Sequence, residues 1–184
     1  MIRVENLTFA YPSGYDNIFE NVSFQIDTDW KLGFVGRNGR GKTTFLNLLQ
    51  GKYEYSGTIQ VSVQFDYFPY PVEDAGRLTE EVFAEVCPSA EEWELMRELS
   101  WLEVDADVLW RPFCTLSNGE QTKVLLAALF LNSGHFLLID EPTNHLDVKA
   151  REIVAEYLKR KKGFILVSHD RSFLDGCVDH ILSI

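Results

Sequence analysis

The spacing of apolar and polar residues along the chain predicts alternating strands and helices. Residues 2–9 alternate like a strand, 18–26 is also strand-like, and Pro12-Ser13-Gly14 between them is a turn signal, so we expect a small antiparallel layer. Further strands are expected at 32–35, 136–140, 163–168 and 180–184, and the run at 136–140 is typical of a buried strand. Helices are expected at 42–50, 118–131, 148–161 and 171–176. This order of elements predicts an α/β fold with a largely parallel sheet.

The middle of the chain changes to helical patterns. Helices are expected over 78–86 and 89–103, and Ser89 with Glu92 fits a capping box at the start of the second one. The apolar residues that recur at helical spacing there, and so predict its packed face, are Trp93, Met96 and Leu99. A strand-like run at 59–65 precedes this helical part, and Gln64 closes it.

We predict a single domain over residues 1–184. Residues 72–115 are expected to form a helical subdomain, inserted into an α/β core with its antiparallel layer that comprises 1–71 and 116–184. A length of 184 residues suits one domain of this kind, and 46% apolar residues are enough for an ordinary core.

Composition and charge narrow the class of protein. No apolar stretch approaches the roughly 20 residues that a spanning helix needs, and no targeting segment is visible, so we expect a cytoplasmic protein without membrane insertion. The three cysteines lack metal-ligand spacing and are expected to be reduced thiols. A net charge of −11 argues against a broad nucleic-acid-binding face. The favoured interpretation of the basic run 159–162 is a set of cations at a helix C-terminus, where they suit the helix dipole.

A glycine-rich segment gives the strongest chemical signal. It matches G-x-x-x-x-G-K-[ST] and lies between an apolar strand and a helix, the context in which this motif cradles phosphates through inward-turned backbone N–H groups. The residues expected to bind ATP here are Gly36, Arg37, Asn38, Gly39, Arg40, Gly41, Lys42, Thr43 and Thr44. Lys42 is expected to reach the β- and γ-phosphates as a catalytic residue, and the Thr43 hydroxyl to bind Mg²⁺.

Carboxylates follow a buried apolar strand in the second half of the chain. Asp140 ends that strand, which suits a residue that organises Mg²⁺, and Glu141 stands one position further on, where a general base would meet an attacking water. His169 follows another apolar strand and is expected to donate a hydrogen bond near the γ-phosphate. These residues predict the hydrolytic half of the site.

Some weaker signals complete the expected site. Gln64 is expected to touch Mg²⁺ or the water through its amide, and Tyr11 to stack on adenine, with Phe9 and Tyr15 competing for that role. Stacking on an aromatic ring is nearly blind to the base, so the pattern leaves the preference for ATP or GTP open.

The segment Leu116-Ser-Asn-Gly-Glu-Gln121 resembles the signature of ATP-binding cassettes (ABC), usually written LSGGQ. The phosphate loop, Gln64, Asp140-Glu141 and His169 occur in the family's order, so the resemblance covers nearly the whole chain. It implies a P-loop NTPase fold of ABC type, with a RecA-like core, an antiparallel β layer and an inserted helical subdomain. It also implies ATP and Mg²⁺ as cofactors.

The resemblance further implies a second cassette as partner. In the family the signature contacts the γ-phosphate held by the opposite cassette, so Ser117 and Gly119 are expected to act in trans from the start of a helix. Asn118 departs from the usual glycine, which leaves the strength of that contact open, and Asp147 matches the family's cross-dimer loop. Hydrolysis is then expected on association with the partner, and only weakly from the isolated domain.

The segments 141–147 and 167–171 resemble the ABC-F group more narrowly. ABC-F proteins are soluble, carry two cassettes joined by a helical linker and act on the ribosome. The chain is therefore expected to be a truncated first cassette, whose partner lies in the same full-length chain or is a second copy in vitro. The short helical lobe and the Arg37-Asn-Gly-Arg-Gly41 loop are similar to the branch that protects ribosomes from lincosamide, pleuromutilin and streptogramin antibiotics.

Two other functions stay open at this point. An ATPase subunit of an ABC membrane transporter shares every one of these catalytic motifs. A neighbouring gene for a multi-span membrane protein would favour that function, and a second cassette in the same reading frame would favour ABC-F. The domain could also be a nucleotide-binding module without activity, used for assembly or sensing.

Overall fold

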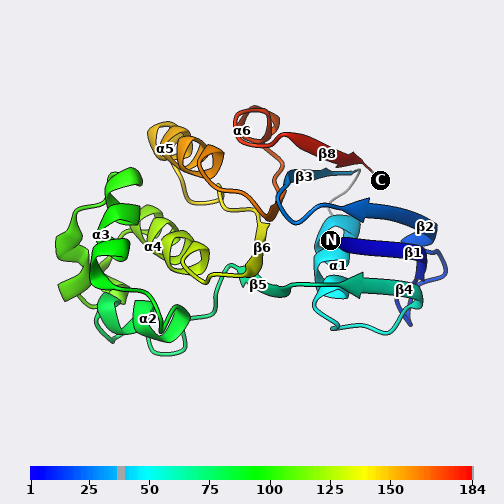
Figure 1. Ribbon diagram of the computed structural model, residues 1–184, viewed down its shortest axis with the longest axis horizontal. Coiled ribbons are helices and arrows are strands. Elements are labelled where there is room, and N and C mark those ends of the chain that lie inside the picture. The colour runs from blue at the N-terminus through cyan, green and yellow to red at the C-terminus, as the bar shows by residue number, and fades with distance from the viewer. Residues whose placement is uncertain (37–39, 184) are drawn as a thin grey trace.

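The computed structural model describes residues 1–36 and 40–183, in which two sheets and a set of helices form the fold (Figure 1). The antiparallel sheet has the order β2-β1-β4, with β1 (Ile2–Phe9), β2 (Phe19–Ile26) and β4 (Ser56–Val61). The other sheet has the order β5-β6-β7-β3-β8, and every neighbouring pair in it is parallel. Its strands are β3 (Lys31–Val35), β5 (Gln64–Phe68), β6 (His135–Asp140), β7 (Phe164–Val167) and β8 (His180–Ser183). The predictions of an antiparallel layer and a parallel sheet are both confirmed.

The helix α1 (Arg40–Leu49) packs between the two sheets. Phe45 is fully buried at its centre, and its ring lies 5.2 Å from that of Phe34 on β3 and 5.5 Å from that of Phe24 on β2, measured between centroids. Burying a side chain of this size contributes about 2–3 kcal/mol. This packing fixes the helix that follows the phosphate loop.

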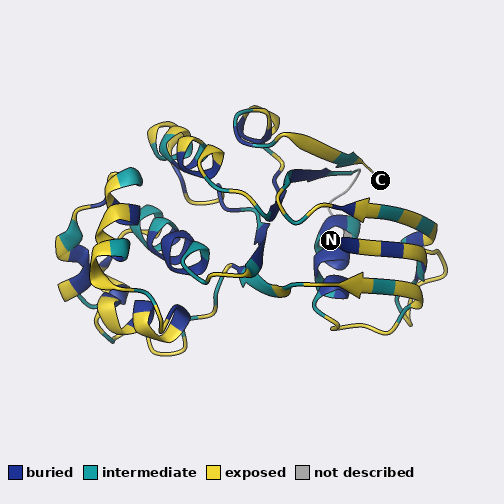
Figure 2. Ribbon diagram, in the orientation of Figure 1, coloured by how far each residue is buried: buried dark blue, intermediate teal, exposed yellow. Residues whose placement is uncertain are grey.

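The other face of the parallel sheet packs against α4 (Asn118–Phe130), α5 (Val148–Lys159) and α6 (Arg171–Asp175). Side chains of successive residues in the central strands point to opposite faces of the sheet, as the pleat requires. Leu137 and Ile139 of β6 belong to this second core, whereas Phe136 and Leu138 belong to the core around α1. Figure 2 shows β6 and β7 as buried, while the outer antiparallel sheet carries many exposed residues. Burial on both faces explains the uninterrupted apolar runs of these strands.

A helical lobe lies between β5 and α4 in the chain, at the left of Figure 1. It contains α2 (Thr79–Val86), α3 (Glu92–Trp101) and two short 3₁₀ helices, Ala106–Trp110 and Phe113–Thr115. The exact division of the chain into core and inserted subdomain stays a prediction.

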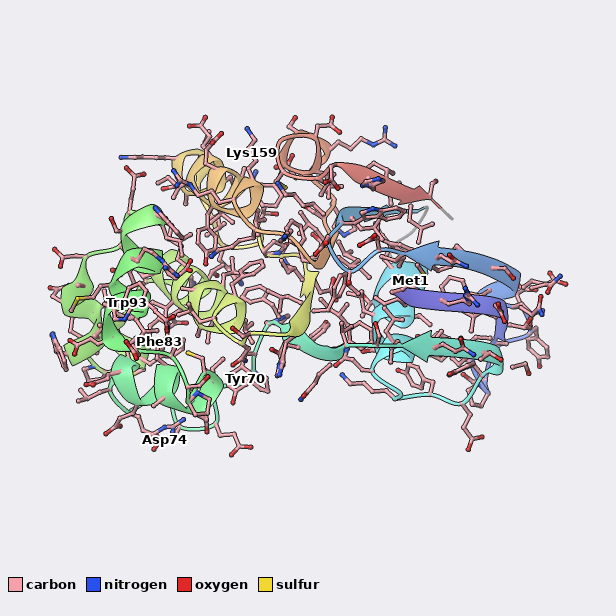
Figure 3. The ribbon with its side chains drawn as sticks, in the orientation of Figure 1. Met1, Tyr70, Asp74, Phe83, Trp93 and Lys159 are labelled. Carbon is pink, nitrogen blue, oxygen red and sulfur yellow. The ribbon has the colours of Figure 1, made fainter. Side chains whose placement is uncertain are left out.

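Helix α3 differs from its prediction in its start and in its packed face. It is capped by Glu91, whose backbone N–H donates to Glu94 Oε2 at 2.9 Å, so the capping box predicted at Ser89 is wrong by two positions. A carboxylate at N3 can satisfy the orphan N-cap donor without a hydroxyl at the cap. Trp93 and Met96 are 57% and 39% exposed, so of the predicted stripe only Leu99 packs inward; Figure 3 labels Trp93 on the lobe.

Over residues 1–36 and 40–183, no helix combines the length and apolar character that crossing a bilayer requires.

Candidate nucleotide-binding and hydrolysis site

The carboxyl ends of β3, β6 and β7 meet at one edge of the parallel sheet. Phe34 of β3 pairs with Val167 of β7, which in turn pairs with Asp140 at the end of β6. A cleft of about 810 Å³ opens beside this edge, and its lining includes Gly36, Gly41, Lys42, Ser168, His169 and Arg171. Ligands of open α/β sheets bind outside the carboxyl ends of the strands. The predicted phosphate loop thus begins where such a fold places a ligand.

Lys42 lies in the wall of this cleft with only 5% of its surface exposed. Among the residues that the structure describes, no acidic side chain forms an ion pair with it. Burying an ammonium without a counter-charge is costly. A cleft with a buried cation fits an anionic ligand such as a polyphosphate.

Part of the predicted loop lies outside the described residues, namely Arg37, Asn38 and Gly39, and the side chain of Arg40 lies outside them too. Gly36 follows β3 directly, and Arg40 begins α1. The segment therefore connects a buried strand to a helix N-terminus, the arrangement expected from the motif.

Thr43 and Asp140 meet across the sheet edge. The Thr43 hydroxyl donates to Asp140 Oδ2 at 3.1 Å, which joins the phosphate-loop helix to the end of β6 although β7 separates their strands. The Tyr67 hydroxyl, from β5, donates to the same oxygen at 2.8 Å. Burial and the hydrogen bond to Asp140 hold the pKa of Tyr67 well above its ordinary value, so this phenol stays protonated near neutral pH. A hydroxyl and a carboxylate are hard oxygen donors, so Thr43 and Asp140 fit Mg²⁺.

Glu141 and His169 face each other at the ends of β6 and β7. The His169 ring Nε2 lies 3.1 Å from Glu141 Oε1, and the His169 backbone N–H donates to Oε2 at 3.2 Å. Glu141 has a φ of +50°, a conformation that costs a non-glycine residue on the order of 1–2 kcal/mol. Its backbone N–H donates to Val167 O at 2.8 Å, which helps to hold this conformation.

Tyr11 contacts the phosphate-loop helix through its hydroxyl. This oxygen lies 2.5 Å from Thr44 Oγ1, and the ring packs edge-on against Phe9 and Tyr53. Phe9 is 5% exposed, which removes it as a surface for adenine, whereas Tyr15 is fully exposed. Tyr11 does not line the 810 Å³ cleft, so stacking of adenine on Tyr11 stays a prediction.

Gln64 lies at the wrong end of its strand for the predicted role. The run 59–65 is broken at Val61, and Gln64 begins β5 opposite His135, the first residue of β6. Asp140 lies five positions beyond His135, about 16 Å at a strand's rise per residue. The assignment of Gln64 to Mg²⁺ or to the attacking water is therefore wrong. The residue of β5 that reaches Asp140 is Tyr67, which the sequence reasoning missed because it took β5 and β4 as one strand.

The signature residues lie on a different cleft. Ser117 is the N-cap of α4 and accepts a hydrogen bond from the Glu120 N–H at 3.1 Å, while the Ser117 N–H donates to Glu120 Oε1. Ser117, Asn118 and Gly119 line a cleft of about 490 Å³, and Asp147, the N-cap of α5, lines it too. This cleft shares no lining residue with the one at Lys42. A smaller hollow of about 240 Å³ lies between Asn118 and the Asp140-Glu141 pair.

The fold and this arrangement of residues define a P-loop nucleotide-binding domain of the ABC ATPase class. A model of the family described as "ABC transporter" matches residues 19–144, and the chain belongs to this family.

Curated relatives point to one branch of that family. The chain is 34% identical to ABC transporter F family member 3 of Arabidopsis thaliana, over 98% of this chain and 26% of that protein. It is 35% identical to the ribosome protection protein VmlR of Bacillus subtilis, over 95% of this chain and 32% of that protein. The chain thus spans about a quarter to a third of the length of these relatives.

Solved structures share the fold at lower identity. A dimeric structure of a post-hydrolysis state of the ATP-binding cassette MJ0796, bound to ADP and Pi, aligns with a TM-score of 0.79 at 20% identity. It covers 100% of this chain and 94% of the other. An ATP-binding subunit of an ABC transporter aligns with a TM-score of 0.78 at 24% identity, over 100% of this chain and 85% of the other. These likenesses confirm the predicted fold class.

Proposed function

We propose that this domain binds Mg²⁺-ATP in the cleft at Lys42 and hydrolyses it when a second cassette closes over that cleft. The observation that carries the proposal is the Thr43–Asp140 hydrogen bond, which brings the phosphate-loop helix and the carboxylate strand end to one point. Lys42 would neutralise the terminal phosphates, and Thr43 with Asp140 would hold the Mg²⁺, which supplies charge stabilisation when bound.

Glu141 is proposed as the general base for the attacking water. Its carboxylate stands one residue past Asp140 and is held by both the backbone and the ring of His169. A carboxylate fixed beside the phosphate cleft can accept the proton that the water loses. His169 lines that cleft and would orient the carboxylate and the γ-phosphate.

The second cassette is proposed from the separation of the two clefts. Ser117 and Gly119 line a cleft that shares no residue with the one at Lys42, so we expect the signature that completes this copy's site to come from a partner. A head-to-tail partner would bring the start of its α4 to this copy's nucleotide, where helix N-termini favour anions. The partner is proposed to be another cassette of the full-length chain, or a second copy in vitro.

The likeness to the ribosome protection protein VmlR supports a ribosomal role for the full-length protein. We place this cassette in a soluble, cytoplasmic, two-cassette protein whose ATP-closed form occupies the ribosome. Resistance to ribosome-targeting antibiotics is proposed from the likeness to VmlR, a ribosome protection protein.

Calorimetry with Mg²⁺ and a non-hydrolysable ATP analogue tests the nucleotide site. Lys42→Ala should weaken binding at least about tenfold, because it removes the buried cation of the cleft. Lys159→Ala, an exposed lysine on α5, is the matched control and should bind as the wild type does. Equal affinities for Lys42→Ala and the control would refute the site.

Turnover by the full-length protein tests the hydrolytic role. Glu141→Gln should lower the rate at least about 100-fold, the range of a lost general base, while nucleotide still binds. Glu152→Gln, an exposed carboxylate on α5, is the control. Unchanged turnover in Glu141→Gln would remove Glu141 from this role.

Co-sedimentation with ribosomes tests the partner. The full-length Glu141→Gln protein should pellet with ribosomes in ATP and stay in the supernatant in ADP. Failure to pellet in both nucleotides, with ATP binding intact, would refute the ribosomal role and leave the ATPase proposal standing.

A further inference from the structure

Asp140 receives two hydroxyl donors on one oxygen, and only one of them belongs to the phosphate-loop helix. Thr43 donates to Oδ2 at 3.1 Å and Tyr67 donates to the same Oδ2 at 2.8 Å. The two donors come from different directions, because Thr43 is on α1 and Tyr67 is on β5, on the far side of β6. The carboxylate therefore lies between two elements that the sheet order keeps apart.

The second donor matters because a single hydrogen bond leaves an aspartate free to turn. The terminal torsion of an aspartate is broad, so one acceptor contact does not set the plane of its carboxylate. Two donors on the same oxygen, from opposite sides, restrict that rotation before any ligand arrives. A group held in place in advance loses less freedom on binding.

Tyr67 is itself well held. Its backbone lies in the β5–β6 ladder opposite Leu138, and the Lys52 ammonium lies 5.2 Å from the centre of its ring. Its hydroxyl donates to Asp140 Oδ2 at 2.8 Å, so its contact with the carboxylate is direct. These contacts make Tyr67 a fixed support rather than a mobile contact.

We infer that Tyr67 is a positioning residue for the carboxylate of Asp140 and, through it, for the Mg²⁺ that accompanies the nucleotide. The inference rests on the proposed function of the Lys42 cleft. Tyr67, and not Gln64, is then the residue of β5 that supports the metal site.

The test measures how much Mg²⁺ strengthens nucleotide binding. Affinity for a non-hydrolysable ATP analogue is measured by calorimetry in Mg²⁺ and in EDTA, and the ratio of the two affinities is compared between variants. Tyr67→Phe keeps the ring and its contact with Lys52 but removes the donor. It should lower the ratio about three- to tenfold, the scale of one typical net hydrogen bond, with affinity in EDTA within about twofold of wild type.

Tyr70→Phe is the matched control. Tyr70 lies just past the end of β5, as Figure 3 shows, and its hydroxyl donates to Glu85 Oε2 at 3.2 Å instead of to Asp140. Its Mg²⁺ ratio should equal that of the wild type. A purely structural role for Tyr67 would lower the thermal midpoint while leaving the ratio unchanged, and that result would overturn the inference.

A second variant separates positioning from a general effect on the cleft. In an Asp140→Asn background, Tyr67→Phe should have no further effect on the Mg²⁺ ratio, because the group it positions is already altered. An equal additional loss in that background would overturn the inference. If the wild type binds the analogue with a Mg²⁺ ratio that Tyr67→Phe preserves, only this inference fails. If the wild type binds no nucleotide, the proposed function fails with it.

Discussion

The Lys161 ammonium lies 2.7 Å from Glu98 Oε1, and it ties the helical lobe to the core. The Glu98 side chain on α3 is 1% exposed and that of Lys161, just past α5, is 16% exposed. The Tyr157 hydroxyl donates to the other oxygen, Oε2, at 2.6 Å. Removing one partner of a buried pair leaves an uncompensated charge, which costs about 3–5 kcal/mol.

Lys161→Met tests this pair because methionine keeps an apolar side chain of similar length but removes the ammonium, which also lies 5.1 Å from the ring centres of Trp101 and Tyr157. Arg97 stays 3.3 Å from the same Glu98 oxygen and offsets part of the loss, so we expect about 2 kcal/mol of destabilisation. For a chain of this length that corresponds to a fall in Tm of about 4–8 °C. Urea and thermal unfolding should be followed by far-UV circular dichroism, because Trp101 next to the mutation would disturb a fluorescence baseline.

The control for this variant is Lys159→Met. Lys159 pairs with Glu156 on the exposed face of α5, so its loss should cost less than about 0.5 kcal/mol. Glu98→Gln should partly rescue Lys161→Met, because a neutral amide in that pocket no longer needs the cation. If Lys161→Met is no less stable than Lys159→Met, or if the double variant shows simple additivity, the argument for a buried ion pair between lobe and core is refuted.

Other side chains give further expected outcomes. Cys114 is exposed and should react with a thiol reagent at pH 8, while Cys87 and Cys177 should react only on unfolding, because burial raises their pKa values to about 11 and about 12. The thiols of the unfolded chain lose their protons at lower pH than the buried thiols do. The free energy of unfolding should therefore be unaffected by these thiols below about pH 9 and should fall as the pH rises towards 12, which unfolding at stepped pH would measure. Gln64→Ala should leave the Mg²⁺-dependent affinity for nucleotide unchanged; a fall would restore Gln64 to the site. Phe45→Ala should cost about 3–5 kcal/mol in urea unfolding and weaken nucleotide binding, since Phe45 anchors α1 between the sheets.

Strands and helices that are buried on both sides could be predicted from the sequence almost to the residue. The runs that became β6 and β7 are apolar throughout because both faces of the sheet are covered, so no alternative periodicity competed with them. Helix α3 was placed less well because half of its residues are exposed. Its acidic residues allow several caps, and Trp93 lies on the solvent side although its spacing suits a packed face. Spacing alone does not say which face of an amphipathic helix meets a neighbour.

The error at Gln64 and the omission of Tyr67 have one cause, the break between β4 and β5. β4 pairs antiparallel with β1 in the outer layer, whereas β5 pairs parallel with β6 in the core, and only two residues separate them. If residues 59–65 formed one strand, Gln64 would lie at its carboxyl end, where an amide could contact the metal. In the structure the chain changes sheets after Val61, and β5 ends at Phe68. Side chains alternate between the two faces of a strand, and Tyr67 is on the face from which its hydroxyl reaches Asp140. Strand pairing depends on residues far apart in the sequence. Local patterns therefore predicted the site residues at the ends of β3, β6 and β7, but they could not predict which residue of β5 would join them.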